Sequence, residues 1–419
     1  MVERTQLANG IRVVSERMRD APSVALGIWV ENGSRYERSD QAGISHFLEH
    51  LLFKGTAERS AAQIAEQIDS IGGVLNAFTG KECTCYYARV LAEDFAVAAD
   101  LLGDIFLNSL LAPEEIDRER GVILQEISQG EDAPDEFIHD VFSLNYWAGH
   151  PLSFPICGSA ETVGSLQRGD FVQFLSERYR PDRLVFAAAG NLLHEDLLAW
   201  VERICGDLSG VAKLVEETPA SPCGGLFAVE KQLEQVHLCF GMDGIAQSSD
   251  ERFAAYLLST ALGGGMSSRL FQEIREKRGR AYSVYSFLSC YRDSGYLGIY
   301  AGTSPEWAEE VVDVVTDQIR KVVRDGLDPD ELERAKKQLK GGMLLGLETS
   351  DSRMTRVAKN EIYFGRHFSI EEVSRRINQV SNDDVVEFGD KLRRRESSAL
   401  AVLGSLDGRG IGADAWDVG

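Results

Sequence analysis

The second half of this 419-residue chain repeats part of the first, and this repetition restricts the possible folds more than any other feature. Five residues of one helix-like stretch return 216 positions later in the same spacing: Leu111, Pro113, Glu115, Ile116 and Arg118 become Leu327, Pro329, Glu331, Leu332 and Arg334. The offset is close to half the chain length, which indicates a duplicated unit. Leu-x-Pro-x-Glu is also a common helix start, because proline fits the first turn. On these residues alone both interpretations stay open.

The order of predicted elements favours duplication. In the first half, apolar strand-like runs at 24–30 and 84–91 alternate with amphipathic helical stretches at 44–54, 61–71, 93–108, 113–130 and 168–179. A Gly- and Pro-rich stretch follows, and then the order returns, with strands at 236–242 and within 281–301 and a helix near 250–262. We therefore expect an α+β fold of two homologous domains, 1–212 and 226–419, joined by a linker at 213–225. Each domain should be a mainly antiparallel β-sheet packed with α-helices.

Composition excludes several classes of protein. A net charge of −22 would repel a phosphate backbone, so we expect no nucleic-acid partner. No run approaches the roughly 18 apolar residues of a membrane span. The seven cysteines are odd in number and scattered, which is typical of a reducing compartment, so we expect a cytoplasmic protein. The acidity indicates either a solvated surface or an acidic chamber that attracts basic peptides.

A His-x-x-Glu-His motif carries the chemistry. At about 100° per residue, Glu49 and His50 lie at roughly −60° and +40° from His46 on a helix, so all three project from one side. Two neutral imidazoles and one carboxylate suit a tetrahedral zinc site with a position left for water. Glu49 beside such an ion could take a proton from the attacking water.

The third ligand should be an acid on another helix. The stretch 113–127 offers several carboxylates, and spacing does not choose among them. Glu119 and Glu126 lie two helical turns apart and therefore share one face.

With these motifs the sequence resembles the pitrilysin family, which includes insulin-degrading enzyme, mitochondrial processing peptidase and short bacterial relatives. In that family His-x-x-Glu-His is followed about 76 residues later by a glutamate, and His50 to Glu126 is 76 residues. The resemblance selects Glu126 as the third ligand, with one zinc per chain. It gives Glu119, seven residues earlier, a supporting catalytic role. It also implies the processing-peptidase-like metallohydrolase fold.

The resemblance extends to substrate binding. The stretch 72–79 is similar to the family's edge strand, where Asn76 and Ala77 would hold substrate by strand addition. Arg275 and Tyr282, also seven apart, match the family's substrate-binding pair. The implied activity is an endopeptidase that cleaves peptides or unfolded segments in an enclosed chamber.

The resemblance also bears on partners and on the alternatives. Short members are similar to dimers, so we expect a homodimer, with a heterodimer containing an inactive relative as the alternative. A different interpretation is a non-catalytic core or assembly subunit; such proteins would be expected to lose ligand residues, and here His46, Glu49, His50 and Glu126 are all present. Cys83 and Cys85 face one side of a strand, and we interpret them as buried small residues without function.

Overall fold

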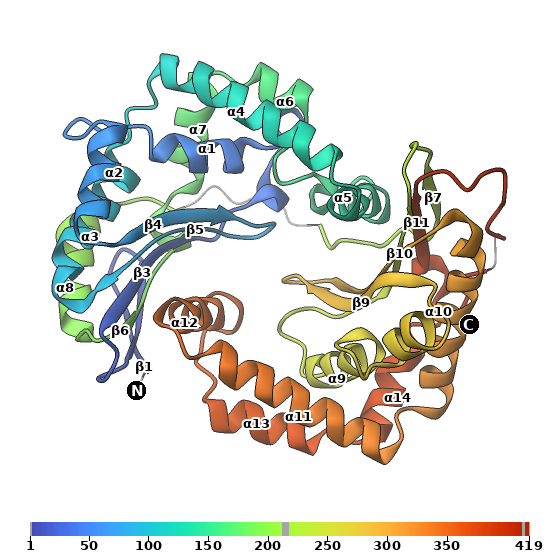
Figure 1. Ribbon diagram of the computed structural model, residues 1–419. Coiled ribbons are helices and arrows are strands. Elements are labelled where there is room, and N and C mark those ends of the chain that lie inside the picture. The colour runs from blue at the N-terminus through green and yellow to red at the C-terminus, as the bar shows by residue number, and fades with distance from the viewer. Residues whose placement is uncertain (1, 212–217, 413–414, 419) are drawn as a thin grey trace. The chain divides into compact units, whose positions relative to one another are not determined.

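The computed structural model describes residues 2–211, 218–412 and 415–418, and here the chain forms two compact units, each built on its own sheet (Figure 1). Unit 1 takes its described residues from 2–128, 154–211 and 346–368. Unit 2 takes them from 129–153, 218–345, 369–412 and 415–418. Neither unit is a continuous stretch of sequence.

Unit 1 contains a six-stranded sheet in the order β1-β2-β6-β3-β5-β4. All its neighbouring strands are antiparallel except β2 and β6, which are parallel. The strands are β1 (Val2–Gln6), β2 (Arg12–Arg17), β3 (Ser23–Val30), β4 (Val74–Thr79), β5 (Thr84–Leu91) and β6 (Leu184–Gly190). β4 forms one edge of this sheet.

Helices cover both faces of the first sheet. One face packs on α1 (Ile44–Leu52), α2 (Ala61–Ser70), α3 (Phe95–Asn108), α4 (Pro113–Glu131), α6 (Ala160–Ser165), α7 (Arg168–Arg178) and α8 (His194–Cys205), and this layer holds the larger apolar core. The opposite face packs on α12 (Ser350–Phe364) through Met354, Val357 and Ile362. Cys83 and Cys85 are buried in this second core, as expected for small residues.

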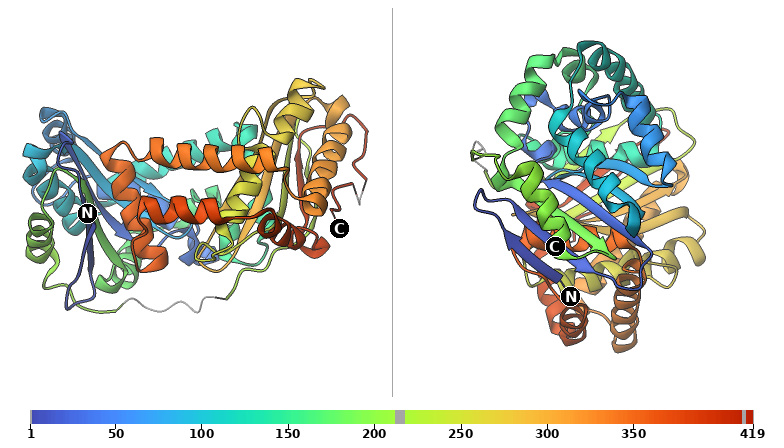
Figure 2. Two further views of the ribbon diagram at one scale, coloured as in Figure 1. Left: turned by 90° about the horizontal axis from the view of Figure 1, so that it is seen from below. Right: turned by 90° about the vertical axis from the view of Figure 1, so that its left-hand side faces the viewer.

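Unit 2 repeats this plan. Its sheet has the order β7-β11-β8-β10-β9, from β7 (Gly225–Val229), β8 (Val236–Asp243), β9 (Ala281–Cys290), β10 (Gly295–Thr303) and β11 (Ala399–Leu403). Its helices are α5 (Pro134–Tyr146), α9 (Arg252–Gly263), α10 (Ala308–Asp325), α11 (Pro329–Gly346), α13 (Ile370–Gln379) and α14 (Asn382–Lys391). One face packs on α9, α10 and α14, and α5 covers the other. α11 and α13 lie side by side (Figure 2), and Lys336 on α11 donates to the carbonyl of Asn378 on α13.

The two units correspond strand by strand. Removing β1 from the first sheet leaves β2-β6-β3-β5-β4, which matches β7-β11-β8-β10-β9 in order and in the single parallel pair. The echoed residues at 113 and 329 begin the equivalent helices α4 and α11. The expected α+β fold of two homologous domains is confirmed.

One helix of each half belongs to the unit built mainly by the other half. α5 follows α4 in the first half yet packs on the second sheet, through Ile138, Phe142 and Tyr146. α12 follows α11 in the second half yet packs on the first sheet. The domain limits at 212 and 226 stay a prediction, and the expected linker at 213–225 lies partly outside the described residues.

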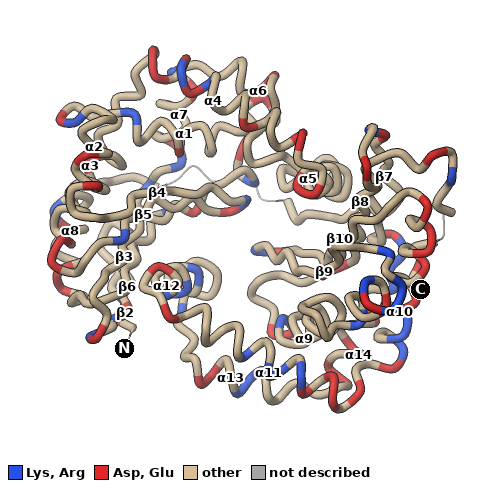
Figure 3. The backbone as a smooth tube through the Cα atoms, viewed as in Figure 1, with Lys and Arg blue, Asp and Glu red and all other residues tan. Residues whose placement is uncertain are grey.

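Two surface properties bear on partners. In the described part of the chain, no helix combines the length and apolar character that crossing a bilayer requires. Acidic and basic residues are interspersed along the helices of each unit (Figure 3).

Candidate metal centre

The motif lies on α1, which the core holds by its apolar side. Ile44, Phe47, Leu48, Leu51 and Leu52 are buried, and the Phe47 ring packs edge-on against Phe171 of α7. The motif side chains project from the remaining side of the helix. A packed helix of this kind gives ligands fixed positions.

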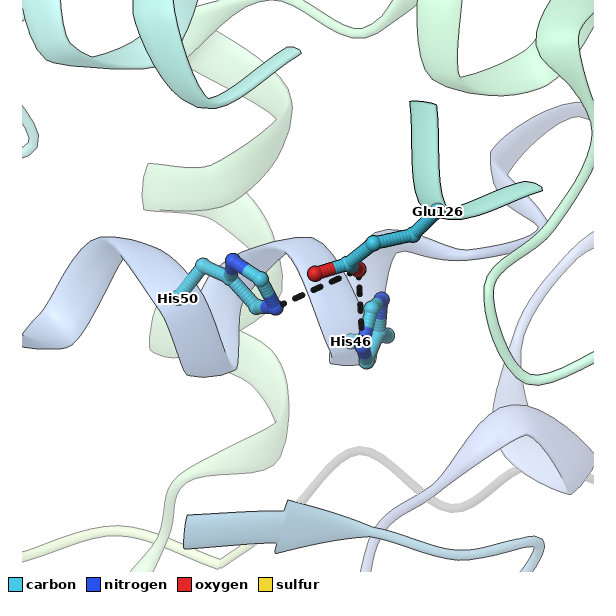
Figure 4. Close-up of side chains that lie close together, drawn as sticks. All are labelled: His46, His50 and Glu126. Atoms are coloured by element: carbon cyan, nitrogen blue, oxygen red, sulfur yellow. Dashed lines mark ion pairs between the residues drawn. The ribbon is translucent and has the colours of Figure 1, made fainter. Parts of the chain in front are cut away.

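Three of these side chains converge on one point. Ligand atoms of His46, His50 and Glu126 all lie within 4.8 Å of one another. Glu126 comes from α4, and its Oε2 lies 3.8 Å from His46 Nε2 and 3.7 Å from His50 Nε2 (Figure 4). The structure therefore brings together the three residues proposed as ligands from the sequence.

The chemistry of this group fits zinc. Burial, and next the neighbouring His50, lower the pKa of His46 to about 4, so its imidazole is neutral near pH 7 and can donate a lone pair. Ligand atoms about 2.1 Å from a tetrahedral ion lie roughly 3.4 Å apart, close to the two distances seen here. Two nitrogens and one oxygen also leave the fourth position open, as in catalytic zinc sites.

Glu119 lies behind the ligand His50. Its buried carboxylate is 3.2 Å from His50 Nδ1 through one oxygen and 2.7 Å from Lys54 Nζ through the other. A carboxylate on Nδ1 keeps the proton there and leaves Nε2 free to bind metal. Lys54, one helical turn beyond His50, neutralises Glu119.

Glu49 stands beside the group and contacts the first sheet. Thr79, the last residue of β4, donates its hydroxyl hydrogen to Glu49 Oε2 at 2.5 Å. Burial raises the pKa of Glu49, while the Thr79 hydrogen bond and the nearby His50 oppose that rise. A carboxylate with a raised pKa suits proton transfer near neutral pH.

Asn76 and Ala77 lie on the edge strand β4. The Ala77 N–H donates to Asn76 Oδ1 at 2.8 Å, which places this N–H on the free side of the strand. Ala77 and Thr79 share one strand face, because successive side chains alternate. The edge strand thus presents backbone groups that no neighbouring strand uses, two residues from the contact with Glu49.

Arg275 and Tyr282 lie together in unit 2, whereas the His-Glu group lies in unit 1. The Arg275 guanidinium stacks 4.8 Å from the Tyr282 ring centre. The pairing of β9 with β10 slips at Tyr282, where Gly302 pairs with Ser283 and Thr303 with Ala281. Such a bulge redirects a side chain, and Tyr282 is 78% exposed.

Two residues of the site were absent from the sequence analysis. Lys54 could have been found, since it lies four residues after His50, within the stretch 44–54 that the sequence predicts as helical; in the structure α1 ends at Leu52 and Lys54 follows it. Thr79 could also have been found, because strand alternation places it on the same side as Ala77.

Comparison with known proteins agrees with the family resemblance and the fold. Residues 12–160 match the model of the insulinase family (peptidase family M16), and residues 165–339 match that of the M16 inactive domain. The chain is 42% identical over 415 residues to an uncharacterized zinc protease of Streptomyces coelicolor, covering 97% of this chain and 90% of the relative. An uncharacterized zinc protease of Bacillus subtilis is 41% identical over 404 residues, with 96% and 98% covered.

Solved structures show the same fold at low sequence identity. A protease from Helicobacter pylori superposes with a TM-score of 0.90 at 21% identity, covering 96% of this chain and 99% of that one. An M16 inactive domain from Pseudomonas fluorescens gives 0.89 at 20% identity, covering 96% and 98%.

The two family models and these relatives therefore assign the chain to a family of peptidases. It belongs to peptidase family M16, the pitrilysin or insulinase family, as a member of the short bacterial type.

Proposed function

We propose that the chain is a zinc-dependent endopeptidase that binds one zinc ion per chain through His46, His50 and Glu126. The observation that carries this proposal is the convergence of two imidazole Nε2 atoms and one carboxylate, with Glu49 beside them. Relatives named zinc protease support it.

Each residue has a distinct task in the proposed reaction. When bound, zinc lowers the pKa of a water molecule toward about 7 and polarises the peptide carbonyl. Glu49 accepts the proton of the attacking water and passes it to the leaving nitrogen, and Thr79 holds the carboxylate in place. Glu119, neutralised by Lys54, keeps His50 in the tautomer that binds metal.

The substrate is proposed to be a peptide or an unfolded segment. An extended chain could add to the free edge of β4 and pair with the backbone of Ala77. The hydrogen bond from the Ala77 N–H to Asn76 Oδ1 would then break, and the N–H would donate to the substrate instead. Cleavage would take place in an enclosed chamber of the kind that the pitrilysin family forms.

The decisive test is a comparison of Glu49→Gln with the parent protein. The amide keeps the shape of the side chain and cannot accept the proton, so about one zinc per chain should remain while peptide turnover falls by several orders of magnitude. If the parent retains zinc yet cleaves no member of a mixed peptide library, the chain is a non-catalytic core or assembly subunit. If neither protein binds zinc, the proposed centre is wrong.

We further propose a cytoplasmic homodimer in which Arg275 and Tyr282 act on substrate at the zinc of the partner subunit. The seven cysteines all lie in the described part of the chain and form no disulfide there, which supports a reducing compartment. Mixing Glu49→Gln chains with Arg275→Ala/Tyr282→Ala chains should restore up to roughly a quarter of parental activity per chain after subunit exchange. Exchange without recovery would instead favour a site built within one chain, or a heterodimer with an inactive relative.

A further inference from the structure

The N-cap residue of α1 has no side chain that could accept a hydrogen bond from the first turn of the helix. That residue is Gly43, with φ +93°, and an added Cβ would lie 2.6 Å from the carbonyl oxygen of Cys157. Only glycine fits this backbone conformation and this close approach. The first N–H groups of α1 therefore need an acceptor from elsewhere in the chain.

Glu37 supplies that acceptor with both of its oxygens. Oε2 accepts the Gly43 N–H at 2.7 Å, and Oε1 accepts the Ser45 N–H at 2.8 Å. The Ser45 hydroxyl also hydrogen-bonds to Glu37, and Asn32 Nδ2 lies 3.3 Å from the same hydroxyl. A carboxylate at a helix N-terminus also interacts favourably with the helix dipole.

The carboxylate is fixed in place by its surroundings. Glu37 is only 4% exposed. The loop that carries it is tied to the β4–β5 hairpin, where the Arg35 N–H donates to the Lys81 carbonyl at 2.8 Å and the Arg35 side chain pairs with Glu82. Burial raises the pKa of Glu37, and the hydrogen bonds from the start of α1 together with the charge of Lys81 oppose that rise.

From these contacts we infer that Glu37 is a positioning residue, which sets the place of His46, Glu49 and His50 by holding the first turn of α1. His46 directly follows Ser45, whose N–H and hydroxyl both bind Glu37. A metal site tolerates displacements of only about 0.5 Å, so loosening this turn should weaken metal binding before it unfolds the unit. The inference rests on the proposed zinc centre.

Glu37→Gln tests this inference with little change in volume. Both oxygens are in use, so whichever way the amide turns, one backbone N–H faces an NH2 group instead of an acceptor. In the metal-free protein, hydrogen exchange of the amides in 43–47 should become about tenfold faster. The zinc dissociation constant, measured by competition with a chromogenic chelator, should rise by about tenfold or more.

Glu361→Gln is the matched control. Glu361 is equally buried, at 3% exposed. It lies on α12, on the opposite face of the first sheet from α1, and its carboxylate accepts two hydrogen bonds from Arg4 of β1. It should lower the melting temperature while leaving zinc affinity and the exchange of 43–47 unchanged. Ser45→Ala is a milder variant, expected to speed this exchange about threefold, and it decides the question if Glu37→Gln does not fold.

The possible outcomes separate the two claims. Parental zinc affinity and exchange in Glu37→Gln would overturn the positioning role, as would an equal loss of zinc affinity in Glu361→Gln. If the parent itself binds no zinc, the metal centre is wrong, and the exchange of 43–47 still shows whether Glu37 holds α1.

Discussion

The contact between Thr79 and Glu49 predicts a defect in turnover without a defect in binding. Thr79→Val keeps the shape and the strand preference of the side chain and removes the hydroxyl. Thr79 contacts neither the three ligands nor Glu119 through a hydrogen bond in the described part of the chain, so metal binding should not change.

The expected size of the effect follows from the kind of bond. A hydrogen bond to a charged group contributes about 1.5 to 3 kcal/mol, and the lower end applies because Glu49 is only partly buried and water can replace the hydroxyl. About 1.5 kcal/mol lost from positioning the base corresponds to roughly a tenfold lower kcat.

Steady-state kinetics on a quenched fluorescent peptide, with zinc content measured on the same samples, would test this. Thr79→Val should lower kcat about tenfold at unchanged KM and zinc content, and Thr79→Ser should stay close to the parent. The reasoning is refuted if Thr79→Val keeps kcat within twofold, or if Thr79→Ser loses as much as Thr79→Val.

Three other substitutions, with one control, probe the centre and its support. Glu119→Gln should weaken zinc binding by about 10- to 100-fold in a chelator titration, because a neutral amide oxygen accepts the His50 Nδ1–H more weakly than the carboxylate and leaves Lys54 without its counter-charge. Unchanged affinity would remove Glu119 from the site. His50→Ala should lose both zinc and turnover, and retained zinc would mean that another group is the ligand. Gly43→Ala should destabilise unit 1 by about 1 to 3 kcal/mol, because its Cβ meets backbone. Gly121→Ala, in open space on α4, should be neutral or slightly stabilising in the same thermal melts.

The parts of the site that could be predicted from sequence are those set by a single helix. The spacing of His46, Glu49 and His50 fixes their common side whatever surrounds the helix. Glu119 and Glu126 share a face of α4, so helical spacing could not say which one meets the metal. In the structure, Glu126 faces the Nε2 side of His50 and Glu119 the Nδ1 side, a difference that depends on how α4 packs against α1.

The fold, like the site, could be predicted only where the sequence pattern is local. The alternation of strands and helices indicated two similar sheets, because that pattern is local. The placement of α5 and α12 was not predictable, since an apolar stripe such as Met354, Val357 and Ile362 fits either sheet equally well. The hydrogen bonds from the start of α1 to Glu37 could not be predicted either, because a carboxylate in a loop, six residues before the N-cap glycine, follows no helical or strand periodicity.

The placement of α5 and α12 means that cutting the chain at its linker would not yield two self-sufficient pieces. A fragment ending near residue 211 would lack α12 and would leave one side of its sheet, including Trp29 and Val185, open to water. It would also carry α5 without the sheet that this helix covers. The chain passes between its units five times, so neither half can complete its folding before the other is made, and a gene split at the midpoint should give proteins that are stable only when produced together.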